Sequence, residues 1–146
     1  MIMENKMNIL LTIQILNFLF YQITTLCDVF PLNNIRKDSA KEMLRESLSG
    51  GLAMGFQIFA TLCGNKILLG ISALLIGLSL LGGFYLWWRP YFFGSDAWWI
   101  EIYNKKFKET IQILPSIKDN PRPPLDRIII HILIVITFIL TLKLLL

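Results

Sequence analysis

Six side chains have the types and positions needed to bind a phosphate group at a membrane surface. Arg–phosphate pairs are charge-assisted and directional, and histidine and aspartate add groups that can titrate. Asp126 and His131 are five residues apart and do not share a helix face, whereas Arg127 and His131 are four apart and do. This spacing favours lipid-headgroup or anion binding over acid–base catalysis, and it predicts no catalytic residue. A protein that binds or modifies lipid headgroups at the cytoplasmic interface is the alternative function for these side chains. The candidates are Arg89, Arg122, Arg127, His131, Asp28 and Asp126.

A second set of polar side chains interrupts the apolar stretches. Gln14, Asn17 and Tyr21 recur at spacings of three and four, so they share one face of a helix, and Gln57 lies in another apolar stretch. This polar intramembrane face predicts hydrogen bonds between helices. The alternative is that it lines the polar path of a small channel or transporter.

Small residues form a third pattern. Gly70, Ala73 and Gly77 lie on one helix face, which is typical of helices that pack closely in membranes. This helix-packing face favours a protein that works by association. We therefore expect a non-enzymatic accessory or regulatory membrane component, either bound to a membrane partner protein or assembled as a homo-oligomer.

Motifs for metals and nucleotides are missing from the sequence. It has no zinc-ligand spacing and no Gly-rich phosphate loop, so we expect no metal and no cofactor. Cys27 and Cys63 are expected at opposite membrane faces, about 30 Å apart, too far for a disulfide. The net charge of +4 is diluted by acidic residues in the same loops. The expected partner is therefore the lipid bilayer and not nucleic acid.

Four apolar blocks must position these side chains, at residues 8–26, 48–63, 67–88 and 128–146. Hydrophobic residues make up 55% of the chain and charged residues only 16%. Three blocks reach the roughly 20 residues that a helix needs to cross a bilayer. The short second block is preceded by Ser39 and Glu42, a capping-box pattern that extends the helix to roughly 36 Å. Gly64 and Asn65 then predict a helix stop and a hairpin with the third block.

The sequence thus predicts an all-α integral membrane protein, a single domain over residues 1–146 with four transmembrane helices and cytoplasmic loops at 27–47 and 89–127. No small-x-small cleavage site follows the first block, so we expect a retained helix there rather than a signal peptide. Eleven Lys and Arg residues fall in the two loops and three on the other side. Because positive residues stay cytoplasmic, both termini are expected outside, at the cell membrane.

The second loop is predicted to hold one cytoplasmic amphipathic helix that starts at Ser95 and ends at Pro115. Its aromatic and aliphatic stripe is expected to lie flat in the membrane interface; docking on a partner is the alternative. The stretch before it, WWRPYFFG, fits an aromatic belt in which Pro90 stops the third helix and Gly94 turns the chain. The stripe consists of Trp99, Tyr103, Phe107, Ile111 and Leu114.

Overall fold

The structure is a computed structural model that describes residues 2–146, with side chains from Glu4 onward. The described residues contain helices and no strand. In chain order the elements are α1 (Ile2–Leu26), α2 (Ala40–Cys63), α3 (Lys66–Gly83), the π-helical turn η1 (Phe84–Trp88), α4 (Arg89–Phe93), α5 (Ala97–Lys106) and α6 (Leu125–Leu145).

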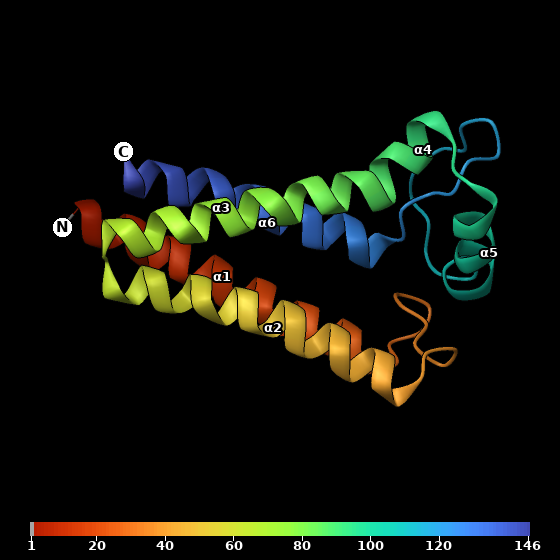
Figure 1. Cartoon of the computed structure of the whole chain (residues 1–146), viewed down its shortest axis with the longest axis horizontal. Helices are drawn as coiled ribbons and strands as arrows, with labels where there is room; N and C mark the ends of the chain where they lie inside the picture. Colours follow the sequence, from red (N-terminus) through yellow and green to blue (C-terminus); the bar gives the residue numbers. More distant parts are fainter. Residues whose placement is uncertain (1) are drawn as a thin grey trace.

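The four long helices, α1, α2, α3 and α6, form a four-helix bundle in which each helix contacts two others (Figure 1). Helix α1 contacts α2 and α6, and α3 contacts α2 and α6. The two chain termini and the turn between α2 and α3 lie at one end of the bundle. The connecting segments and α5 lie at the other end, which we call the loop end. All four helices therefore run between the same two ends.

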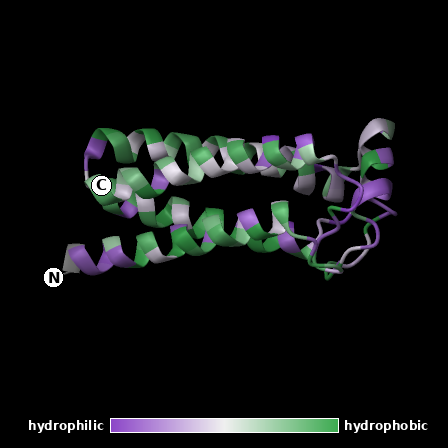
Figure 2. Ribbon diagram, turned by 90° about the horizontal axis from the view of Figure 1, so that it is seen from below, coloured by the Kyte–Doolittle hydropathy of each residue, from purple (hydrophilic) through white to green (hydrophobic). Residues whose placement is uncertain are grey.

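Within the described residues, three helices are long and apolar enough to cross a membrane, over Glu4–Leu26, Lys66–Phe93 and Leu125–Leu145. The predicted fourth span, α2, is not among them. Its first two turns carry the charged residues Lys41, Glu42, Arg45 and Glu46, so its apolar part is shorter than its 24 residues. Apolar residues are the majority along the long helices, and hydrophilic residues are concentrated at the loop end (Figure 2).

The predicted helical hairpin of α2 and α3 is present, with the predicted start and stop signals. The Ser39 side chain accepts a hydrogen bond from the Glu42 amide at 3.2 Å, and the Glu42 carboxylate accepts one from the Ser39 amide at 2.8 Å. Gly64 ends α2 with a positive φ of 62°. Asn65 caps α3 by accepting from the amides of Ile67 and Leu68.

The prediction that Pro90 stops the third helix is wrong. The helix continues through Pro90 to Phe93, because the chain widens into η1 immediately before the proline. The Arg89 amide donates to the carbonyl of Phe84, five residues earlier. A proline lacks an amide proton and its ring collides with the preceding turn of a regular α-helix, and a π-type turn relieves this collision. Gly94, with a φ of 88°, ends the helix instead.

The predicted amphipathic helix is shorter than expected. Helix α5 ends at Lys106, and Ile111 lies outside it. The amide of Ile111 donates to the carbonyl of Pro31, and its carbonyl accepts from the amide of Leu125, both at 2.9 Å. These bonds tie the segment after α5 to two other parts of the chain, and they replace the helical continuation that the residue spacing predicts.

The aromatic stripe of α5 packs on the chain itself. Trp99 and Tyr103 are buried. The ring of Trp99 meets the ring of Trp87 edge to face at 5.3 Å, and the ring of Phe107 meets Trp87 at 4.9 Å. Trp98, on another face of α5, remains exposed. The buried members of the stripe thus hold the loop end against the third helix.

Candidate functional site

Two of the predicted anion-binding residues form one cluster with a residue of α2. Arg127 donates from Nη1 to the Glu46 carboxylate at 3.1 Å, and its Nε atom lies 3.4 Å from the carboxylate of Asp126. The guanidinium also lies over the ring of Trp87, 5.7 Å from its centre. Asp126 is buried, and one of its carboxylate oxygens has no hydrogen-bond partner in the described residues. This ion cluster joins α2, the third helix and α6 at the loop end.

Three other predicted members lie apart from this ion cluster. Asp28 pairs with Arg36 at 2.5 Å. The guanidinium of Arg89 lies over the ring of Tyr85. Arg122 donates to the carbonyl of Leu114 from its side chain and to the Tyr103 hydroxyl from its amide. Each of these three predicted residues is therefore engaged by a different partner within the chain.

Tyr103 organises the loop end. Its hydroxyl accepts hydrogen bonds from the Gln112 side chain and the Arg122 amide. Burial raises the pKa of Tyr103, so the phenol stays protonated at neutral pH. Lys106, at the end of α5, pairs with Asp38 and lies 3.8 Å from the Glu42 carboxylate. The Tyr103 contacts attach α5 to the segment before α6, and the Lys106 contacts attach it to the start of α2.

His131 lies one helical turn after Arg127 on α6, and its imidazole faces the third helix. It is nine-tenths buried, and its Nδ1 atom lacks a hydrogen bond of normal geometry within the described chain. A Cβ atom built on Gly83 would overlap its Nε2 atom. The ring of Trp88 meets the imidazole edge to face at 6.1 Å. The absence of a side chain at Gly83 therefore makes room for the imidazole between α6 and the third helix.

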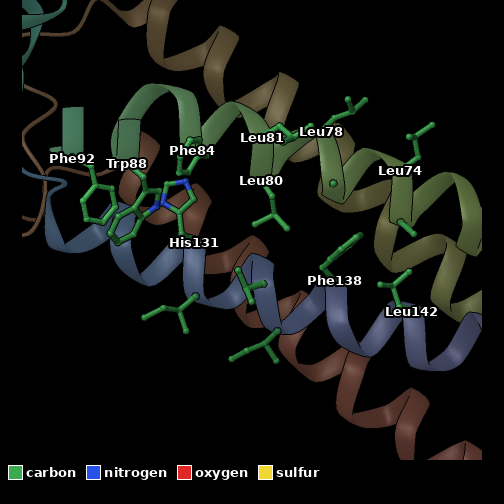
Figure 3. Close-up of a pocket in the computed structure, with 15 residues that line it drawn as sticks. Leu74, Leu78, Leu80, Leu81, Phe84, Trp88, Phe92, His131, Phe138 and Leu142 are labelled. Atoms are coloured by element: carbon green, nitrogen blue, oxygen red, sulfur yellow. The ribbon is translucent and has the colours of Figure 1, made fainter. Parts of the chain in front are cut away.

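His131 lies at the loop end of a groove between α3 and α6, which we call the α3–α6 groove (Figure 3). The groove has a volume of about 1060 Å³. Its lining is apolar except for the imidazole of His131 and the indole N–H of Trp88, and it includes no Asp, Glu, Lys or Arg. The lining residues are Ala73, Leu74, Gly77, Leu78, Leu80, Leu81, Phe84, Trp88, Phe92, His131, Ile132, Val135, Ile136, Phe138 and Leu142.

The predicted helix-packing face contributes to this groove. Ala73 and Gly77 line it, and a Cβ on Gly77 would meet Phe138 at 3.8 Å, an ordinary van der Waals contact. Gly70 is not a lining residue, and a Cβ built there would meet nothing within 4 Å. Within this chain, α3 and α6 contact each other, and the small residues at 73 and 77 line the groove beside that contact.

The predicted polar intramembrane face points into the bundle. Gln14, Asn17 and Gln57 are buried, with 2%, 3% and 7% of their surfaces exposed. Both side-chain polar atoms of Gln14 and the amide oxygen of Asn17 have no hydrogen-bond partner in the described residues. Tyr21 is half-buried and donates to the carbonyl of Glu46 at 2.9 Å. None of these four residues lines the α3–α6 groove.

Sequence reasoning did not find the groove, although signals for it exist. Phe84, Trp88 and Phe92 recur every four residues and share a helix face. On α6, Ile132, Val135 and Ile136 form a stripe of the same kind. Such stripes are also typical of helices that face lipid, so the spacing alone does not distinguish a groove from an ordinary membrane surface.

The chain has no match among family models, curated proteins or solved structures. The functional argument therefore depends on the geometry.

Proposed function

We propose that this is a small, non-enzymatic, four-span membrane protein that binds an apolar or amphipathic molecule from the bilayer. The α3–α6 groove is the observation that carries this proposal. It lies between two helices that are long and apolar enough to cross a membrane, so lipid is the medium at its opening. Its volume of about 1060 Å³ is at the upper end of the roughly 300–1,000 Å³ found for small-molecule sites.

The contacts of α2 with α1 support a fourth crossing. The side chains of Tyr21 and Gln22 donate to the carbonyls of Glu46 and Ser47. A Cβ on Gly51 would overlap the Gln22 side chain, so the glycine lets this side chain of α1 lie against α2. At 24 residues, α2 is about 36 Å long. Together with the excess of Lys and Arg in the two loops, this arrangement favours a cytoplasmic loop end and external termini.

Groove-filling substitutions test the proposed function. A Leu at Gly77 extends into the groove, whereas a Leu at Gly70 is a matched control on the same helix with nothing within 4 Å of its Cβ. The purified protein is extracted with organic solvent, and the lipid released per chain is measured by mass spectrometry. We expect Gly77→Leu to lower the retained lipid several-fold and Gly70→Leu to leave it unchanged. Equal retention in wild type and both variants would refute the proposal.

The same variants address association, which the helix-packing face predicts. Oligomer size is measured by light scattering in detergent and in nanodiscs. If Gly70→Leu changes the oligomer size and Gly77→Leu leaves the bound lipid unchanged, then the face mediates assembly with a second copy, and the groove does not bind lipid.

A small channel or transporter is a second candidate, favoured by the unpaired polar atoms of Gln14 and Asn17. An unpaired amide is costly in a membrane interior, and water or a small solute would relieve that cost. Flux of ions and small neutral solutes into liposomes that contain the protein tests this candidate. Flux equal to that of empty liposomes would leave these side chains a packing role only.

A further inference from the structure

We propose that the ligand of the α3–α6 groove is an uncharged lipid with a planar, hydrogen-bonding head and a long apolar tail, a quinone-type lipid, with its head beside His131. This inference rests on the proposed function and assigns the chemistry of the same site. It follows from the charge of the lining, from the side chains at the loop end of the groove and from the length of the groove.

The lining of the groove contains no group that would balance a charged head. It includes no Lys, Arg, Asp or Glu. Arg89, next to Trp88 in the sequence, lies over Tyr85, and Arg127, one turn before His131, pairs with Glu46, so both guanidinium groups are engaged elsewhere. Bringing an uncompensated phosphate into such a lining costs far more than burying an uncharged group. An uncharged lipid head therefore fits the groove better than an anionic phospholipid head does.

The side chains at the loop end suit a planar ring with hydrogen-bond acceptors. Trp88 meets His131 edge to face, and it stacks on Phe92 at 6.3 Å with an angle of 23° between the rings. Figure 3 shows Phe84, Trp88, Phe92 and His131 together at this end of the groove. Offset and edge-to-face contacts are the favoured geometries for a further aromatic ring. The imidazole supplies the N–H that a quinone carbonyl would accept.

The rest of the groove suits the tail. Leu142, the far lining residue on α6, is eleven residues after His131, which corresponds to about 16 Å along a helix. That length is about half of the roughly 30 Å hydrocarbon core of a bilayer. A tail beside α6 would therefore reach from the loop end to beyond the middle of the membrane, and it would meet apolar side chains along this whole distance.

Binding of decylubiquinone to the full chain in phosphatidylcholine nanodiscs tests the assignment. Quinones quench tryptophan fluorescence, and Trp88 lines the groove. The Gly77→Leu variant, in which the groove is filled, is the control. It gives the background of collisional quenching by quinone that is dissolved in the bilayer. Decanol and phosphatidylglycerol serve as competitors, because decanol has a matching tail without the ring and phosphatidylglycerol has an anionic head. Thermal unfolding without ligand establishes that each variant is folded.

We expect saturable quenching in the wild type that decanol and phosphatidylglycerol do not reverse. His131→Leu should weaken quinone binding about tenfold, the factor for one hydrogen bond, and His131→Gln, which keeps a donor, should weaken it less. Two results would overturn the quinone assignment while the proposed function stands: unchanged affinity in His131→Leu, or displacement by decanol. A wild type that shows no saturable quenching but retains lipid sensitive to Gly77→Leu would also overturn only the assignment. If that lipid retention is lost as well, the proposed function fails too.

Discussion

The imidazole of His131 occupies the space that a side chain at Gly83 would need. A Cβ on Gly83 would overlap Nε2 of His131, whereas a Cβ on the neighbouring Gly82 would meet nothing within 4 Å. Two adjacent glycines on one helix therefore have different roles, and only Gly83 is required by its neighbour on α6.

Gly83→Ala should destabilise the protein, because His131 must move or the two helices must separate. Overpacking of this kind costs typically 1–3 kcal/mol. Gly82→Ala should be neutral or stabilising, by up to about 1 kcal/mol, because alanine favours the helix. Denaturant unfolding in detergent measures both. In the double variant Gly83→Ala with His131→Ala, the cost of the alanine at position 83 should fall. Equal stability of Gly83→Ala and Gly82→Ala would contradict the contact between Gly83 and His131.

Arg127→Met should destabilise the bundle, because it leaves the carboxylate of Asp126 without its neighbouring positive charge. Breaking buried ion pairs costs about 3–5 kcal/mol and breaking exposed pairs about 0–1 kcal/mol. The Glu46 side chain is 44% exposed, so we expect about 2 kcal/mol. Arg36→Met is the control, because Arg36 pairs with Asp28 at the surface with 64% of its side chain exposed, and it should cost less than 1 kcal/mol. Thermal unfolding measures both variants. A similar loss of stability in Arg127→Met and Arg36→Met would show that the ion cluster does not stabilise the contacts among α2, the third helix and α6.

These examples show what the sequence predicts and what it does not. The capping box of Ser39, the stop at Gly64 and the α2–α3 hairpin follow from the sequence, because each depends on residues only a few positions apart. The pair of Glu46 and Arg127 joins residues far apart in the chain, and no local pattern marks it. The α3–α6 groove likewise depends on how two helices from distant parts of the chain lie beside each other.

The two wrong predictions, at Pro90 and at Ile111, have different physical causes. Pro90 is a helix breaker in a regular α-helix, yet the wider turn of η1 before it accommodates the ring. Ile111 has helical spacing with Phe107, but its backbone hydrogen bonds to Pro31 and Leu125 place it in a connection without regular secondary structure. In both cases non-local packing or a local change of helix type overrides a rule based on single residues.

Acid should weaken the start of α2. Hydrogen bonds from the Ser39 backbone and side chain hold the pKa of Glu42 below its usual range. The lowered pKa means that the ionised form stabilises the fold. This stabilisation is present above the usual carboxyl pKa and is lost as the pH falls through the lowered value. Glu42→Gln should remove this part of the acid dependence, and Ser39→Ala should cost about 1 kcal/mol at neutral pH. Unfolding midpoints of the three proteins from neutral to acid pH measure the effect; parallel curves for wild type and Glu42→Gln would contradict it.

Gln14→Leu tests whether the interior amide has a partner. If the amide is unpaired, as its contacts indicate, its burial costs about 1–3 kcal/mol, and leucine should raise the unfolding free energy by about 1 kcal/mol or more. Leu10, one turn away on α1 and also buried, provides the control substitution Leu10→Ala, which should destabilise by about 2–5 kcal/mol. If Gln14→Leu lowers stability, the amide has a partner such as bound water, and the channel or transporter candidate gains support.

The two native cysteines test the four-span topology. Cys27 follows α1 at the loop end, Cys63 ends α2 at the opposite end, and both are free and exposed. With four spans and a cytoplasmic loop end, a membrane-impermeant maleimide added to intact cells should label Cys63 and not Cys27. Cys27→Ser should therefore keep the label, and Cys63→Ser should lose it until the membrane is permeabilised. In a variant with both cysteines replaced, Asp119→Cys should react only after permeabilisation. If α2 does not cross, Cys63 and Cys27 lie on the same side and both or neither react from outside, which would exclude a fourth span.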